Sequence, residues 1–121
     1  MPPTDAELAA LESRLAALLD PYRDRLESME VYGRPFLRLP GANKHQWFAG
    51  VNRQKGVVRF SLLPMYQHPE LLDGISPGLL KRRTGASLFT FDSIDAAQLA
   101  ELGGLVSRSF NVYEQGVGPR P

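Results

Sequence analysis

The sequence predicts an α+β fold, a two-layer sandwich whose N- and C-terminal helices pack on a mainly antiparallel sheet. Leucines recur at helical spacing near the N-terminus, apolar and polar residues alternate in the middle, and helical spacing returns near the C-terminus. A chain of 121 residues with 43% hydrophobic and 22% charged residues is typical of one globular domain. We therefore expect a single domain over residues 1–121, with frayed tails at 1–3 and 116–121.

The first helix is expected to begin after Thr4, because Thr4 and Glu7 form a capping-box pattern. Its apolar stripe consists of leucines three or four residues apart: Leu8, Leu11, Leu15 and Leu18. Pro21 disfavours helical geometry at the preceding residue, so a second short helix should start there. Its inward-facing residues would be Tyr22, Leu26 and Met29.

The middle of the chain predicts strands and short helical turns. Residues 31–39 alternate in polarity and indicate one strand, placed at an edge or broken because Pro35 has no N–H to donate. Residues 46–52 and 57–63 predict a hairpin with Gly56 in the left-handed turn position. Helical turns capped by His68 and Ser76 should follow, then a strand over 87–91.

A long C-terminal helix should begin after Asp92 and Ser93. Its apolar positions are again three or four residues apart: Leu99, Leu102, Val106, Phe110 and Tyr113. The stripes of the two long helices and one side of the central hairpin must bury each other. The predicted core therefore contains Leu8, Leu11, Leu15, Val58, Phe60, Leu62, Leu102 and Val106.

The net charge of +1 conceals an uneven distribution along the chain. Residues 1–33 sum to −4, residues 34–83 to +7 and residues 84–121 to −2. Such a basic block bears on binding partners and not on the fold. Mutual neutralisation of the three segments in the folded domain is the simpler alternative.

The composition also limits compartment and chemistry. The absence of cysteine excludes disulfides, thiolate catalysis and cysteine-bound metals, and it fits a reducing compartment. The N-terminal residues lack the pattern of a secretory signal, and no apolar run approaches the ~20 residues of a membrane span. We therefore expect a cytoplasmic protein with no membrane partner.

Two motifs that suggest catalysis fail on inspection. Residues 74–78 match G-x-S-x-G, but no strand precedes them and no histidine follows Ser76, so Ser76 is expected to cap a helical turn. His45 and His68 are the only histidines and lack the close spacing of a zinc site. We expect no catalytic residues and favour a non-enzymatic protein.

Short motifs across residues 46–91 resemble the YdhG-like family of small bacterial domains. They are Phe48-Ala49-Gly50-Val51, Leu63-Pro64-Met65-Tyr66, Pro69-Glu70-Leu71-Leu72, Ile75-Ser76-Pro77, Lys81-Arg82-Arg83 and Gly85-Ala86-Ser87-Leu88-Phe89-Thr90-Phe91. The resemblance implies an α+β sandwich similar to frataxin, a fold to which iron handling has been attached.

An iron site is the alternative functional hypothesis. Asp20, Asp24 and Glu27 would share one face if residues 20–27 formed a regular helix, and carboxylate oxygens suit hard cations. This hypothesis describes a frataxin-like iron chaperone. A solvated helix face, partly neutralised by Arg23 and Arg25, is the competing interpretation.

The leading hypothesis is a ligand-binding or interaction domain that uses one face of the sheet. Arginines alternate with aromatic residues there, a combination that suits a small anion, a nucleotide or a single strand. The candidate residues are Tyr32, Arg34, Phe36, Arg38, Phe48, Arg59, Lys81, Arg82 and Arg83. A small molecule or another protein is the expected partner, and a nucleic acid is an alternative. The competing interpretation is that the turns at Leu71-Leu72 and Leu79-Leu80 cover these aromatics.

Overall fold

The structure is a computed structural model that describes residues 3–31, 34–40 and 46–117. Its elements, in chain order, are α1 (Asp5–Ala17), the 3₁₀ helix η1 (Asp20–Arg25), β1 (Glu27–Val31), β2 (Arg34–Arg38), β3 (Trp47–Gln54), β4 (Val57–Leu62), α2 (Pro64–Gln67), the 3₁₀ helix η2 (Pro69–Leu72), α3 (Pro77–Leu80), β5 (Arg83–Gly85), β6 (Leu88–Phe91) and α4 (Ala96–Val117).

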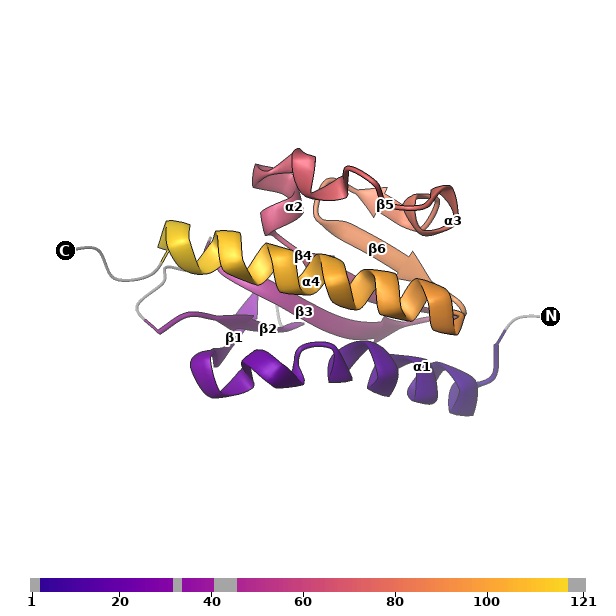
Figure 1. The fold of residues 1–121 in the computed structure, drawn as a ribbon. Coiled ribbons are helices and arrows are strands. Elements are labelled where there is room, and N and C mark those ends of the chain that lie inside the picture. The colour runs from indigo at the N-terminus through magenta and orange to yellow at the C-terminus, as the bar shows by residue number, and fades with distance from the viewer. Residues whose placement is uncertain (1–2, 32–33, 41–45, 118–121) are drawn as a thin grey trace.

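The six described strands form one antiparallel sheet in the order β1-β2-β3-β4-β6-β5. The helices α1 and α4 lie side by side across the same face of this sheet (Figure 1). Leu18, just after α1, approaches Gly103 of α4, so the two helices meet over the sheet. The predicted two-layer α+β sandwich is confirmed.

The helix α1 forms as its sequence predicts. The Thr4 hydroxyl accepts a hydrogen bond from the Glu7 amide at 3.1 Å, and the Glu7 carboxylate accepts one from the Thr4 amide at 3.0 Å. This capping box satisfies backbone donors that a helix start leaves without partners. The leucines Leu8, Leu11 and Leu15 are buried.

The prediction of a second α-helix reaching Met29 is wrong. Residues 20–25 form one short 3₁₀ segment, and Met29 lies in β1 opposite Phe36 of β2. The single strand expected over residues 31–39 is in fact β2, preceded by its hairpin partner β1. Tertiary pairing overrides the local helical pattern of residues 26–29 because the β1–β2 ladder satisfies their backbone groups.

The sequence predicted that the strand containing Pro35 would lie at an edge of the sheet or be broken. Pro35 lies in β2, the second strand of the sheet, and not at its edge. Its neighbour on one side is Glu30 of β1. On the other side, the recorded pairing between β2 and β3 covers only Leu37–Ala49 and Arg38–Trp47. The missing N–H of Pro35 is tolerated because Pro35 lies beyond that pairing.

The central hairpin is confirmed, but its turn is shorter than the four residues 53–56 expected from the sequence, because β3 continues to Gln54. The strands β3 and β4 pair from Ala49–Leu62 to Gln54–Val57, which leaves Lys55 and Gly56 as the turn. Gly56 has a φ of 80°, a left-handed conformation in which a side chain would be strained. The turn therefore fixes the register of both strands.

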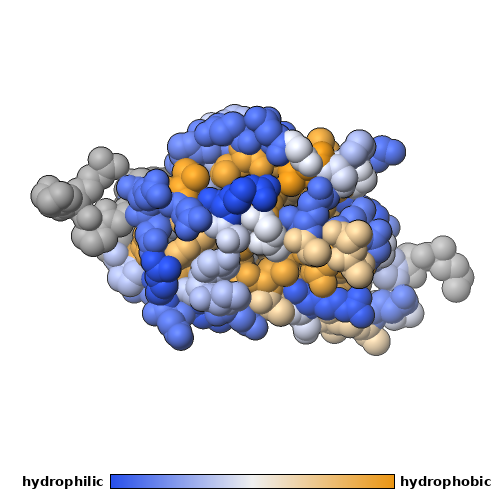
Figure 2. Space-filling model, viewed as in Figure 1, coloured by the Kyte–Doolittle hydropathy of each residue, from blue (hydrophilic) through white to orange (hydrophobic). Residues whose placement is uncertain are grey.

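The predicted core is also confirmed. All of its members are buried, with Phe60 at 0% and Leu11 at 5% exposure. They belong to one apolar cluster that also contains Phe48, Phe89, Phe91 and Phe110. On the helix-covered side, hydrophilic residues dominate the outer surface and apolar residues lie recessed between them (Figure 2).

Residues 64–80 pack along α4. The Ser76 backbone and hydroxyl donate hydrogen bonds to Glu101 of α4 at 2.8 Å and 2.6 Å, and these bonds hold the pKa of Glu101 below its ordinary value. Arg108 of α4 reaches the Leu71 carbonyl. Ser76 caps α3 as predicted, through the amide of Leu79. His68 precedes η2, but its side chain makes no capping hydrogen bond.

Candidate functional site

The sheet has a second face, turned away from α1 and α4, which we call the open face. Residues opposite each other in an antiparallel pair point to the same side, so the register assigns each side chain. Val58, Phe60 and Leu62 of β4 point to the helices, and Arg59 and Ser61 point away from them. The open face contains Glu27, Met29, Arg34, Phe36, Arg38, Trp47, Gly50, Asn52, Gln54, Val57, Arg59, Ser61, Leu88 and Thr90.

Within the described chain, no helix covers the open face. The short helices α2, η2 and α3 contact α4, and α1 contacts β3 and β4 from the opposite side. Leu71 and Leu79 are buried in the same apolar cluster as the long helices. The expectation that the turns carrying these leucines cover the aromatic residues is therefore wrong.

Arg59 lies near the middle of the open face. Asn52 of β3 and Thr90 of β6 are its cross-strand neighbours, and both side chains offer hydrogen-bonding groups. The Arg59 Nε is buried and has no hydrogen-bond partner among the described residues. A buried donor without a partner costs free energy, and an acceptor supplied by a ligand would recover it.

Phe36 and Trp47 form an aromatic pair beside this polar row. Their ring centroids are 4.6 Å apart with planes at 46°, and both side chains are half-buried. The Phe36 ring lies over Gly50. A Cβ atom at Gly50 would meet Phe36 Cδ1 at 2.5 Å and the Pro35 carbonyl oxygen at 2.7 Å, so glycine is required for this approach.

Phe48 was predicted to belong to this surface and does not. It is 0% exposed and packs against Phe110 and Tyr113 of α4 and Tyr22 of η1. The register between β2 and β3 shifts between Leu37–Ala49 and Arg38–Trp47, so Phe48 is an extra residue in a β-bulge. The bulge turns Phe48 toward the helices and leaves Trp47 on the open face.

The arginines of β2 have different surroundings. Arg34 is exposed at the strand end and has no ion pair or hydrogen bond within the described residues. The Arg38 Nε donates to Glu27 of β1 at 2.9 Å, so its charge is partly neutralised. The predicted face member Tyr32 lies outside the described residues.

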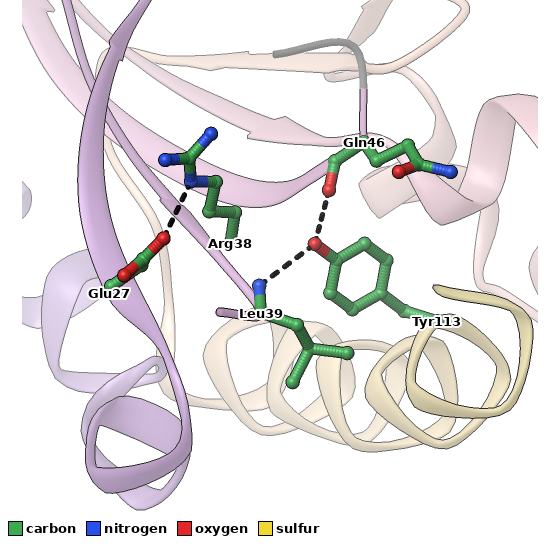
Figure 3. A network of polar contacts seen from close by, with 5 residues as sticks. All are labelled: Glu27, Arg38, Leu39, Gln46 and Tyr113. Carbon is green, nitrogen blue, oxygen red and sulfur yellow. Dashed lines mark hydrogen bonds and ion pairs between the residues drawn. The ribbon is translucent and has the colours of Figure 1, made fainter. Parts of the chain in front are cut away.

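Figure 3 shows how the end of β2 is fixed close to Arg38. The Tyr113 hydroxyl of α4 accepts a hydrogen bond from the Leu39 amide at 3.1 Å and donates one to the Gln46 carbonyl. Burial raises the pKa of Tyr113 above its ordinary value. This contact anchors the two ends of the 39–46 connection to the C-terminal helix.

Lys81, Arg82 and Arg83 lie at the other end of the sheet. Arg83 belongs to β5, four strands from β2, which corresponds to roughly 19 Å at the usual spacing between strands. Arg82 pairs with Asp92 at 2.9 Å and lowers the pKa of Asp92. Arg83 donates to the Ala86 carbonyl at 3.1 Å, and Lys81 is exposed. The structure therefore does not place this cluster beside the aromatic pair.

The geometry expected for the iron site is wrong. Asp20 and Asp24 lie in η1, whereas Glu27 lies in β1, so no regular helix aligns the three acids. Asp20 pairs with Arg23 at 2.6 Å, and Glu27 pairs with Arg38. Arg25 pairs with Glu114 and does not neutralise this group. The described residues contain no group of three or more ligands that could hold a metal ion.

The Gly74–Gly78 motif shows no catalytic arrangement among the described residues. Ser76 hydrogen-bonds with Glu101 and with the Leu79 amide, both structural contacts. The His68 ring lies 3.2 Å from the Glu70 carboxylate. It is the one histidine among the described residues. His45 lies outside the described residues.

Sequence reasoning missed Trp47, Asn52 and Thr90. Asn52 follows from the hairpin register once the two-residue turn at Lys55-Gly56 is known, because it lies opposite Arg59. Thr90 follows from the pairing of β4 with β6, which local patterns do not specify. Trp47 depends on the bulge.

Comparisons with known proteins leave the family open. No family model matches the chain, and neither the curated proteins nor the solved structures gave a significant match. In the described part of the chain, none of the helices combines the length and apolar character needed to cross a membrane.

Proposed function

We propose that this chain is a non-enzymatic binding domain whose open face takes a nucleotide or a similar ring-bearing anion. The observation that carries the proposal is the arrangement of Arg59, whose Nε has no hydrogen-bond partner among the described residues, on the strand next to Trp47 and two strands from Phe36. An arginine can hold a phosphate through paired hydrogen bonds, and an aromatic ring can stack on a base.

The spacing on the open face supports a ligand of this size. Phe36 lies opposite Gly50, and Arg59 lies one strand further and two residues along. Strand spacing and rise place the Cα atoms of Phe36 and Arg59 roughly 12 Å apart. The arginine side chain covers part of that distance, which leaves space for a ring and an attached anionic group.

The charge of the open face favours an anion. Among its described side chains, Arg34, Arg38 and Arg59 are cationic, and Glu27 is the acid that offsets one of them. Asn52, Ser61 and Thr90 add uncharged donors and acceptors along the same surface. Lys81, Arg82 and Arg83 are not part of this proposed site because they lie at the far edge.

The family and location belong to the same proposal. Membership of the YdhG-like family, with its likeness to frataxin, rests on the sequence motifs quoted above, and an α+β sandwich is compatible with it. A shared architecture does not define a function. A cytoplasmic location is supported by the absence of cysteine from the sequence.

The test is a set of separate titrations of the protein with AMP, adenosine and inorganic phosphate, in which Trp47 fluorescence is the measured signal. Trp47 is the sole tryptophan, so the signal reports on the open face. AMP should bind more tightly than adenosine or phosphate, and added salt should weaken its binding because ions screen the arginines. Arg59→Ala should weaken AMP binding by about 10- to 150-fold, since a charged hydrogen bond contributes roughly 1.5–3 kcal/mol.

Arg34→Ala should also weaken binding, and Arg14→Ala is the matched control. Arg14 is an exposed arginine on α1, on the helix side of the sheet. Arg14→Ala and Arg34→Ala should keep the free energy of unfolding within about 0.5 kcal/mol of the original chain, and Arg59→Ala should not lower it, because this variant removes a buried donor that has no partner among the described residues. An equal loss of affinity in Arg14→Ala, or the absence of saturable binding, would remove the proposal. Unfolding of Arg34→Ala or Arg59→Ala would show that this arginine is structural.

A further inference from the structure

A cavity is lined by residues of the end of α1, of η1 and of β1, β2 and β3. The end of α1 and η1 lie on the helix-covered side of the sheet (Figure 1). The volume of the cavity is about 160 Å³. The walls include Ala16, Leu19, Leu37 and Val51, and the polar lining residues are Arg23 and Ser28. The cavity borders the site proposed above, because Phe36 and Gly50 of the open face also line it.

The cavity has the size of a single ring. A closed apolar protein cavity of about 150 Å³ binds benzene, and this cavity, which is open to solvent beside the exposed Arg23 and Ser28, has a similar volume of about 160 Å³. The small side chains of Ala16 and Ser28 create this space between the helical layer and β1. Such walls favour an apolar ligand body, since water gains few hydrogen bonds from them.

The polar lining favours an uncharged ligand group. The Arg23 guanidinium is held by Asp20 at 2.6 Å and by the Ala16 carbonyl at 3.3 Å. Asp20 therefore offsets the charge of Arg23, while further guanidinium N–H groups are available to donate. The Ser28 hydroxyl makes no hydrogen bond within the described residues, so it offers both a donor and an acceptor.

From these observations we infer that this cavity binds a neutral aromatic molecule of one ring that carries one hydrogen-bonding group, the class represented by phenol. The ring occupies the space among Ala16, Leu19, Leu37 and Val51. The hydroxyl of the ligand hydrogen-bonds with Ser28 or Arg23. A ligand this small is expected to bind with a millimolar Kd.

The test follows the backbone amide shifts of the protein during titration with phenol. Shifts should saturate and should centre on the cavity. Ala16→Leu fills the cavity and should weaken phenol binding at least tenfold. Ala17→Leu is the matched control, because Ala17 is the exposed neighbour on the same helix and does not line the cavity. Its affinity for phenol should equal that of the original chain.

Ser28→Val blocks the cavity from the opposite wall and keeps the test valid if Ala16→Leu fails to fold. Toluene should bind more weakly than phenol, and Ser28→Ala should reduce that difference. Tighter binding of benzoate than of phenol would overturn the assignment of a neutral ligand. Unsaturable shifts, or equal binding by the blocked variants, would overturn the site itself.

Discussion

The two faces of β4 differ completely in what surrounds them, although their residues alternate along one strand. Val58, Phe60 and Leu62 are each 0% exposed beneath α1 and α4. Arg59 and Ser61 point to the open face, where no described helix packs. The covered face supplies the burial that stabilises the fold, so the side chains of the open face are free to serve another purpose.

The covered face was the more predictable one because burial leaves a periodic pattern in the sequence. Every expected core residue is buried, from Leu8 to Val106. The open face has no such requirement, and its membership depends on register. Because of a single β-bulge, Phe48 lies on the covered face and Trp47 lies on the open face. The comparison teaches that alternation assigns faces only within an unbroken ladder.

The largest effect is expected for Phe60→Ala on the covered face. The substitution removes a ring that is 0% exposed and leaves a cavity, at a cost of about 3–5 kcal/mol in the free energy of unfolding. Chemical denaturation of this variant beside Ser61→Ala measures the contrast. Ser61→Ala should change the free energy of unfolding by less than about 0.5 kcal/mol. Equal losses in the free energy of unfolding for Phe60→Ala and Ser61→Ala would contradict the claim that only the covered face stabilises the fold.

Gly50→Ala is expected to be the costly substitution on the open face. Its Cβ would lie 2.5 Å from Phe36 Cδ1 and 2.7 Å from the Pro35 carbonyl oxygen, so β2 must shift. Overpacking of this kind costs about 1–3 kcal/mol. Thermal unfolding measures the loss, and Trp47 fluorescence should change because Phe36 contacts that ring. If Gly50→Ala were as stable as the original chain, β2 would be able to shift away from the added Cβ atom without a cost in free energy.

Tyr113→Phe should cost about 1–2 kcal/mol in the free energy of unfolding, since it leaves the Leu39 amide and the Gln46 carbonyl without their partner. Denaturation at neutral pH measures this cost. No loss would mean that water replaces the hydroxyl and that the 39–46 connection needs no anchor on α4.

The same residue predicts a dependence on alkaline pH. The pKa of Tyr113 is raised above 10.0 in the folded chain because the side chain is buried. The unfolded chain therefore loses this proton first. The associated stability is present below the ordinary tyrosine pKa of 10.0 and is lost as pH rises through the higher folded pKa. A stability profile from neutral to alkaline pH should show a smaller loss in Tyr113→Phe.

A smaller effect is expected at Ser109, a buried polar residue of α4. It is 0% exposed, and within the part of the chain that the structure describes its hydroxyl has no hydrogen-bond partner. Ser109→Ala removes a buried polar group and improves helix propensity, so the free energy of unfolding should rise by about 1 kcal/mol. Thermal unfolding checks the sign. A lower stability would show that the Ser109 hydroxyl is satisfied in solution.

The fold was therefore more predictable than the candidate site. Capping at Thr4, leucine spacing in α1 and the turn at Gly56 are local signals, and each appears as expected. Residues 20–29 carried an equally plausible helical pattern, but pairing of β1 with β2 determined their structure. The aligned acids of the iron hypothesis depended on that helix and were lost with it.

Local sequence patterns do not predict which residues from different strands meet in the site. Arg34, Phe36, Arg38 and Arg59 share a face because β2, β3 and β4 are neighbours in the sheet. Lys81, Arg82 and Arg83 belong to the same basic block of the sequence, but they lie on the far edge strand or beside it. Strand order decides which residues meet, and nonlocal contacts specify that order.

The most direct test of the two-face account is a map of backbone amide shifts during titration with AMP. The account predicts saturable, salt-sensitive shifts in β2, β3 and β4, centred on Phe36, Trp47 and Arg59, and their loss in Arg59→Ala. The amides of α1 and of α4 should stay unchanged. Shifts confined to those helices, or none at all, would contradict the claim that the open face is the binding surface.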